Sequence, residues 1–360
     1  MKWSWKIATI SGIPVYLHAT FLALIAFLLL GRLAQGEGLK AAVGGALFVV
    51  AIFATVVLHE FGHAFAARHY GIRTRDITLL PIGGIARLER LPDVPRQELW
   101  VALAGPAVNI VIAAIGWPLV VFLALGHPDM DLWGATNTPL GQFVIVNVWL
   151  AGFNLIPAFP MDGGRALRAL LAERLEYVRA TEIAANLGQG LALVFGFLGL
   201  FSNPFLVFIA LFVWMGASGE SAAASVRSAI AGIAVSRAMI TDFHALRATD
   251  PLQRAAELVI AGSQQHFPVV EADGQVVGVL TREVLVRALS EHGLDGAVGD
   301  AMTRSFQTAD AREPLDRALA RLQLCACPVL PVLDNGRLVG LVTADNISEY
   351  VMIRGALRRA

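Results

Sequence analysis

Long apolar segments constrain the fold of this chain more than any other feature of its sequence. Six segments are long and apolar enough to cross the hydrocarbon core of a bilayer, which is about 30 Å thick. They lie approximately at residues 14–34, 41–63, 99–125, 139–160, 187–202 and 204–218. Hydrophobic residues make up 56% of the chain and charged residues 16%, whereas soluble domains carry about 25% charge. We therefore expect residues 1–218 to form a multi-pass α-helical membrane domain with about six transmembrane helices.

The charges of the connecting segments indicate the orientation of the chain in the membrane. Residues 64–97 and 161–187 are rich in arginine, whereas residues 126–138 contain Asp129 and Asp131 and neither Lys nor Arg. Because short loops rich in Lys and Arg stay in the cytoplasm, we expect both arginine-rich segments on that side. The prediction is a protein of the cell membrane with both chain ends in the cytoplasm.

The second apolar segment ends in a motif that is typical of metal sites. His59-Glu60-Phe61-Gly62-His63 reads H-E-x-x-H, and residues four apart share one face of a helix. His59 and His63 can therefore bind one metal ion, while Glu60 can act as general base to a water molecule at that ion. A carboxylate at membrane depth is costly and indicates function. The alternative is that these side chains lie in the headgroup zone and form only hydrogen bonds.

Asp162 is the candidate for a third metal ligand. A catalytic zinc site has three protein ligands and one open position, and Asp162 follows the fourth apolar segment on the expected cytoplasmic side. Pro157 and Pro160 break the helix there and can turn a carboxylate inward. The alternative role for Asp162 is an N-cap of the following helix.

After Ser218 the composition becomes that of a soluble protein, and the sequence repeats itself. Ala238-Met239 recurs as Ala301-Met302, and Val277–Thr281 recurs as Val339–Thr343, at a spacing of about 62 residues, which indicates a duplicated module. Each copy is predicted to run helix, strand, glycine turn, strand, helix. We expect an α/β domain pair built as follows: a linker at 219–234, a first copy at 235–293 and a second copy at 298–355.

These motifs together resemble the site-2 protease family of intramembrane zinc metalloproteases, peptidase family M50. The H-E-x-x-H motif matches, and Asn154 to Gly164 matches the family pattern N-x-x-P-x-x-P-x-D-G. Further matches are Ile13-Pro14 with His18, Pro81-Ile82-Gly83-Gly84, and Ala104-Gly105-Pro106 with Asn109. The resemblance covers roughly residues 10–218. The duplicated region resembles a tandem pair of CBS domains, which a subgroup of the family carries.

The resemblance implies a role for each matching residue. It implies one Zn²⁺ ion held by His59, His63 and Asp162, with Glu60 as the catalytic base. Asn154 matches a residue that helps to hold the substrate or the oxyanion, and its alternative role is a hydrogen bond between helices. The remaining matches, Gly83 and Gly84, correspond to a hairpin whose edge can pair with an unwound substrate strand. An equally supported alternative is that these glycines only form a turn. The implied reaction is cleavage of the transmembrane segments of membrane proteins in regulated intramembrane proteolysis.

The resemblance to CBS domains implies an adenine nucleotide bound between the two copies. Many nucleotide-binding copies place an Asp three residues after a Thr, where it binds the ribose. Here Val284 follows Thr281 and Asn346 follows Thr343 at that spacing, and Asp345 stands one position early. A structural role, or homodimer formation through the CBS domains, is therefore equally open.

Two other functions fit parts of the sequence. A transporter or channel regulated by CBS domains also joins membrane helices to a CBS pair, but transporters show repeated broken helices, and no internal repeat precedes Ser218. A zinc-binding scaffold without activity would not need Glu60. The formal net charge of zero gives no indication of a nucleic-acid partner. We expect the two cysteines, Cys325 and Cys327, to be reduced thiols in a cytoplasmic domain.

Overall fold

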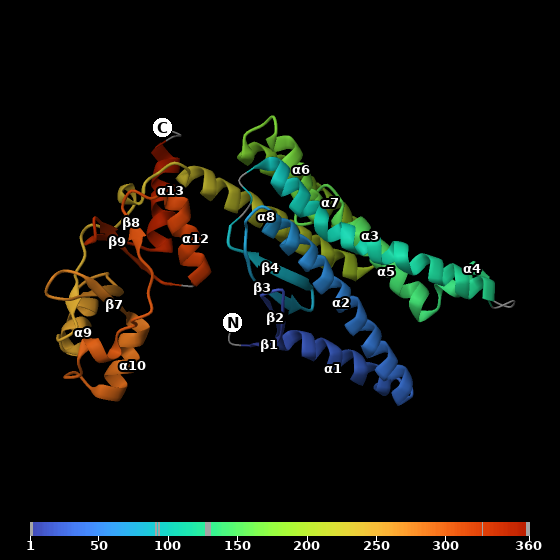
Figure 1. Cartoon of the computed structure of the whole chain (residues 1–360), viewed down its shortest axis with the longest axis horizontal. Helices are drawn as coiled ribbons and strands as arrows, with labels where there is room; N and C mark the ends of the chain where they lie inside the picture. The colour runs from blue at the N-terminus through green and yellow to red at the C-terminus, as the bar shows by residue number, and fades with distance from the viewer. Residues whose placement is uncertain (1–2, 91, 93, 127–130, 326, 358–360) are drawn as a thin grey trace. The chain divides into compact units, whose positions relative to one another are not determined.

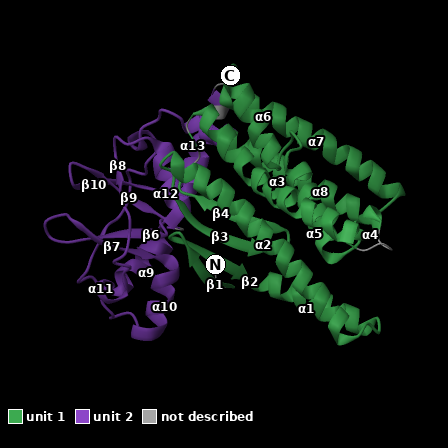
Figure 2. Cartoon of the chain, turned by 45° about the vertical axis from the view of Figure 1, so that its right-hand side comes forward, with its two compact units in different colours: residues 1–224 green, residues 225–360 purple. Residues whose placement is uncertain are grey.

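The computed structural model describes residues 3–90, 92, 94–126, 131–325 and 327–357. Asp129, which helped to orient the membrane segments above, lies outside the described residues. The chain divides into two compact units, residues 1–224 and residues 225–360 (Figure 2).

Helices make up most of the described part of the first unit (Figure 1). They are α1 (Ala19–Ala34), α2 (Leu39–His69), α3 (Pro95–Gly126), α4 (Leu132–Thr136), α5 (Pro139–Asn154), α6 (Asp162–Ala172), α7 (Tyr177–Phe201) and α8 (Pro204–Ile230), the last of which ends in the second unit. Among the described residues, α2, α3, α7 and α8 are long and apolar enough to cross a membrane, and α1 is a shorter apolar helix. The expected multi-pass helical domain is confirmed, with fewer long helices than six.

Two of the predicted apolar segments are only partly helical. Residues 14–18 belong to strand β2 (Ile13–His18), so α1 begins at Ala19. Val15 and Tyr16 are residue types that favour strands, and β2 pairs with strands on both sides. The segment 139–160 is helical only as far as Asn154, because Pro157 and Pro160 cannot continue the hydrogen-bond pattern of a helix.

A four-stranded sheet supports the end of α2 that carries the H-E-x-x-H motif. Its strands are β1 (Ser4–Ile10), β2, β3 (Thr74–Leu80) and β4 (Gly83–Leu88), in the order β1-β2-β3-β4. β2 and β3 run parallel, and the other neighbours are antiparallel. Phe61 and Ala64 of α2 pack with Ile13, Val15 and Ile77 of the sheet. This contact fixes the rotation of α2 beside β4, one of the two edge strands.

The outward faces of the long helices carry large apolar side chains. Phe122, Leu125 and Phe201 are 73%, 82% and 79% exposed. Exposed surfaces of this kind are unusual on a soluble monomer and suit contact with lipid.

The second unit contains two copies of one α/β motif. The first copy comprises β5 (Leu246–Arg247), α9 (Leu252–Ala261), β6 (His266–Val270), β7 (Val276–Thr281) and α10 (Arg282–His292). The second comprises α11 (Val298–Ala301), β8 (Ala309–Asp310), α12 (Leu315–Cys325), β9 (Leu330–Asp334), β10 (Arg337–Val342) and α13 (Ala344–Leu357). The predicted order of helix, strand, turn, strand and helix is confirmed in both.

The segment that precedes the first strand of each copy packs against the other copy. Ile230 and Val235, which lie before β5, are buried with Leu315 and Leu330 of the second copy. Val298 of α11 is buried in the core of the first copy instead. The two copies are therefore interlocked in a single unit.

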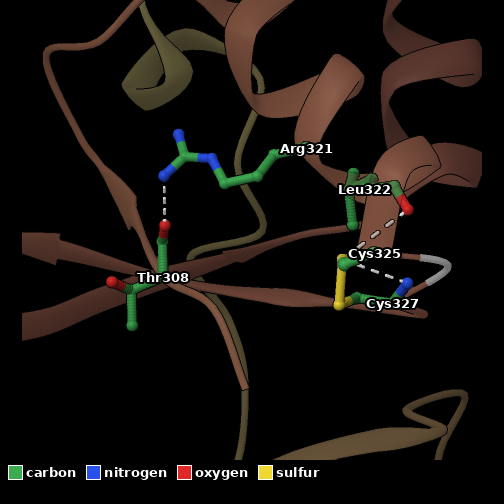
Figure 3. Close-up of a disulfide and its surroundings, with 5 residues drawn as sticks. All are labelled: Thr308, Arg321, Leu322, Cys325 and Cys327. Carbon is green, nitrogen blue, oxygen red and sulfur yellow. Dashed lines mark hydrogen bonds between the residues drawn. A yellow bond between two sulfur atoms is a disulfide. The ribbon is translucent and has the colours of Figure 1, made fainter. Parts of the chain in front are cut away.

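The two cysteines form a disulfide, which differs from the expectation of reduced thiols (Figure 3). α12 ends at Cys325, and the Cα atoms of Cys325 and Cys327 lie 5.0 Å apart. This separation is within the range that a disulfide needs. Beside it, Arg321 donates a hydrogen bond to the Thr308 carbonyl at 2.6 Å.

Candidate active site

Three side chains converge where α2 approaches the start of α6. The Nε2 atoms of His59 and His63 lie 3.0 Å apart, and Oδ2 of Asp162 lies 3.1 Å from each. His59 and His63 are 7% and 8% exposed. In the part of the chain that the structure describes, these residues form the one group of three or more that could hold a metal ion.

The hydrogen bonds of the two imidazoles leave their Nε2 atoms as acceptors. Nδ1 of His63 donates to the carbonyl oxygen of Val101 at 2.7 Å. Nδ1 of His59 bonds to Oδ1 of Asn109 at 2.6 Å. With both protons on Nδ1, two nitrogen lone pairs and a carboxylate oxygen face one another, which suits a cation between them. A tetrahedral zinc ion with ligand distances of about 2.0–2.1 Å separates its ligand atoms by about 3.3 Å, so the residues fit zinc after a small outward shift.

A chain of amides orients Asn109. Its Nδ2 donates to Oδ1 of Asn147 at 2.9 Å, and Nδ2 of Asn147 donates to the Phe143 carbonyl at 2.9 Å. Both asparagines are buried. Sequence reasoning noted Asn109 only as a motif match and missed Asn147, although an amide within an apolar segment was a usable signal.

Asp162 is the first residue of α6, and Met161 is the N-cap. The alternative role of Asp162 as an N-cap is therefore not what the structure shows. Its carboxylate points to the two histidines at the N-terminal end of a helix, where a negative charge is favoured.

Glu60 lies beside the edge of β4 and outside the triangle of ligand atoms. Its Oε2 accepts a hydrogen bond from the backbone N–H of Ala86 at 3.1 Å. A Cβ on Gly84 would lie 2.6 Å from Cγ of Glu60, so only glycine leaves room for this side chain. Gly83, with φ of 138°, starts the strand and has no atom within 4 Å of an added Cβ.

Asn154 lies at the end of α5 and is bonded within its own helix. Its Nδ2 donates to the Leu150 carbonyl at 3.0 Å. The structure thus brings His59, His63 and Asp162 together, with Glu60 and Gly84 beside them, and leaves Asn154 turned to its own backbone.

A cavity of about 40 Å³ lies between the H-E-x-x-H motif and several charged residues. It is lined by Glu60, His63, Ala86, Leu88, Pro92, Glu98, Val101, Ala102, Arg165 and Arg168. This volume is enough for ordered water, and it places polar groups next to Glu60.

Among the described histidines of the second unit, His266 has a shifted pKa. Burial lowers the pKa of His266, the carboxylates of Glu283 and Asp345 oppose this effect, and the positive charge of Arg282 adds to it.

Two family models and several curated proteins match the sequence of this chain. The model of peptidase family M50 matches residues 47–128 and 127–195, and the CBS domain model matches residues 235–291 and 298–353. A zinc metalloprotease of Methanocaldococcus jannaschii is 32% identical over 98% of this chain and 97% of its own length. Stage IV sporulation protein FB of Bacillus subtilis is 28% identical over 45% of this chain and 54% of its own length.

A solved structure is also similar. The site-2 protease from Methanocaldococcus jannaschii is 38% identical and covers 61% of this chain and 95% of its own, with a TM-score of 0.46. The sequence matches favour a protease over a CBS-regulated transporter or channel. The chain belongs to peptidase family M50, as a zinc metalloprotease of the site-2 protease type with a C-terminal pair of CBS domains.

Proposed function

We propose that His59, His63 and Asp162 bind one Zn²⁺ ion and that Glu60 is the catalytic base. The substrate is a peptide bond in a transmembrane segment of another membrane protein. The observation that carries this proposal is the set of three acceptor atoms within 3.1 Å of one another. One cation between two imidazole nitrogens and a carboxylate oxygen at that distance is bound by all three groups at once.

The bound metal and the residues around it have separate roles in the proposed reaction. Bound zinc would polarise the scissile carbonyl and lower the pKa of a water molecule. Glu60 takes the proton of the attacking water and passes it to the leaving amine. The outward N–H of Ala86, which now donates to Glu60, and the edge at Gly83 and Gly84 can pair with an unwound substrate strand. Asn154 would release the Leu150 carbonyl in order to hold the substrate.

The site faces the cytoplasm in this proposal. Arg165 and Arg168 line the cavity beside Glu60, and the arginine-rich segments of the chain belong on the cytoplasmic side by the positive-inside rule. Water then reaches Glu60 from the cytoplasm, and the CBS pair lies in that compartment too.

We propose that the CBS pair is a regulatory or dimerising module. The Thr281 and Thr343 hydroxyls accept hydrogen bonds from the N–H groups of Val284 and Asn346, at the positions where an Asp would bind ribose. Calorimetric titration of the full-length protein with ATP and AMP checks this: heat of binding supports nucleotide regulation, and a concentration-dependent dimer without heat supports dimerisation.

The variant Glu60→Gln tests the proposed function. It keeps the ligands and removes the base, so zinc content stays at one ion per chain while cleavage falls about 10²–10⁴-fold. Cleavage of a transmembrane substrate by the purified protein is the assay, and atomic emission gives the zinc content. A chelator abolishes wild-type cleavage, and added Zn²⁺ restores it.

Glu173→Gln is the matched control for this variant. Glu173 is partly exposed and pairs with Arg96, away from the ligand triangle, so this variant keeps both zinc and cleavage. Cleavage by Glu60→Gln at the wild-type rate would rule out the assigned base.

A further inference from the structure

A buried arginine joins three helices next to the metal ligands. Arg168 of α6 is 2% exposed. Its Nε donates to Oε1 of Glu98 on α3 at 2.8 Å, and its Nη2 donates to the same oxygen. Its Nη1 donates to Oε2 of Glu220 on α8 at 3.2 Å. A buried charge is stable only with such partners, so the three helices are held in one arrangement.

The same guanidinium supports the loop that leads to Asp162. It lies 4.9 Å from the ring centroids of Phe159 and Tyr177, within the range of a cation–π contact. Phe159 is completely buried and stands three residues before Asp162. Arg168 therefore contacts both the helix that Asp162 begins and the loop that precedes it.

α8 touches this loop a second time. Gly216 lies one helical turn before Glu220, on the same face. A Cβ on Gly216 would lie 2.7 Å from Cβ and Cγ of Pro160, so the α8 backbone presses directly on the loop. Glu220 also lies 3.7 Å from Arg165, three residues after Asp162. One face of α8 thus reaches the chain on both sides of Asp162.

The other end of α8 belongs to the CBS unit. Ile230, its last residue, is completely buried with Leu315 and Leu330 of the second copy. The Ala229 carbonyl accepts a hydrogen bond from Nη1 of Arg354 at 3.2 Å. A single continuous helix therefore contributes to the CBS core and to the support of Asp162.

We propose that Arg168 and Glu220 are positioning residues through which α8 sets the place of Asp162, so that packing of the CBS core on α8 changes zinc affinity. The inference rests on the proposed zinc site. Groups that orient a ligand typically change metal affinity by 10–100-fold when they are removed. The CBS pair would then regulate the enzyme through its metal centre.

The first experiment measures zinc affinity of the full-length protein in detergent by chelator competition. Glu220→Ala leaves Arg168 paired with Glu98 and is expected to weaken zinc binding by about 10-fold or more. Gly216→Ala places a methyl group against Pro160 and changes no charged group. It is expected to weaken zinc binding as well, and it provides a second variant if Glu220→Ala folds poorly. Amide hydrogen exchange of residues 161–164 in metal-free protein rises in both variants.

Glu173→Ala is the control, because it removes an exposed ion pair between Arg96 of α3 and the residue that caps the end of α6. It leaves zinc affinity and the exchange of residues 161–164 unchanged. Equal zinc affinity in Glu220→Ala, Gly216→Ala and Glu173→Ala would overturn the proposal. Absence of zinc from the wild-type protein would instead overturn the proposed function.

A double-mutant cycle tests the link to the CBS core. Ile230→Ala loosens the packing of α8 in that core and is expected to change zinc affinity several-fold. Because the effect passes through Glu220, it is expected to shrink in the Glu220→Ala background and to remain in the Glu173→Ala background. Additive effects with Glu220→Ala, or no effect of Ile230→Ala, would exclude the link.

Discussion

Asn109 and the Val101 carbonyl leave the same nitrogen of His59 and His63 available to a metal. The H-E-x-x-H spacing predicts that the two imidazoles share a helix face, and they do. The spacing says nothing about which nitrogen carries the proton, because that depends on partners in α3. Residue types could therefore be predicted from the motif, whereas their tautomers required the packing of α2 against α3.

Gly105 tests how closely α3 must approach the imidazoles. A Cβ at this position would lie 2.2 Å from Nε2 of His63 and 2.6 Å from Nε2 of His59. Gly105→Ala is therefore expected to reduce zinc below one ion per chain and to abolish cleavage. Gly44→Ala on α2 is the control, since an added Cβ there meets no atom within 4 Å. Full zinc content in Gly105→Ala would contradict the geometry.

At the scale of elements, strand β4 and the break in the helix after α5 add the remaining residues of the site to those on α2. β4 belongs to the arginine-rich segment 64–97, whose charges indicated a loop. A hairpin at Gly83 and Gly84 was implied only by the resemblance to the site-2 protease family. Whether Gly84 faces the site depends on the pairing of β4 with β3 and of the sheet with α2. Such pairings join distant parts of the chain, which local sequence patterns do not determine.

Gly84 separates the role of the base from the role of the ligands. Gly84→Ala places a methyl group against Cγ of Glu60 and displaces the carboxylate. Cleavage is expected to fall about 10²-fold, while zinc content stays at one ion per chain. Single-turnover cleavage and atomic emission measure the two quantities. Loss of zinc together with activity would show that Gly84 supports the ligands instead.

At the scale of the whole molecule, the two units differ in how much of each was visible in the sequence. The internal repeat predicted the order of elements in both CBS copies. It did not show that the segment before the first strand of each copy packs against the other copy. A hydrophobic residue in a sequence indicates burial but not which residues it will contact. α8, predicted to end near residue 218, continues to Ile230 and so joins the two units.

Orientation in the membrane is tested by cysteine labelling. In a Cys325→Ser/Cys327→Ser background, Trp133→Cys is expected to react with an impermeant maleimide on intact cells. Trp133 is 77% exposed on α4, within the segment 126–138 that lacks Lys and Arg. Glu257→Cys in the CBS pair is expected to react only after permeabilisation. The opposite pattern would reverse the proposed topology.

The sequence by itself determined the residue types of the site, the membrane character of the first unit and the repeat in the second. Apolar length, the spacing of two histidines and internal similarity are local properties that need no partner. Tertiary structure alone decided that Asp162 meets His59 and His63 across about a hundred residues, that Asn109 and Asn147 orient His59, and that Arg168 binds α8 to the loop before Asp162. These contacts depend on how helices pack, and packing is a property of surfaces brought together from distant segments.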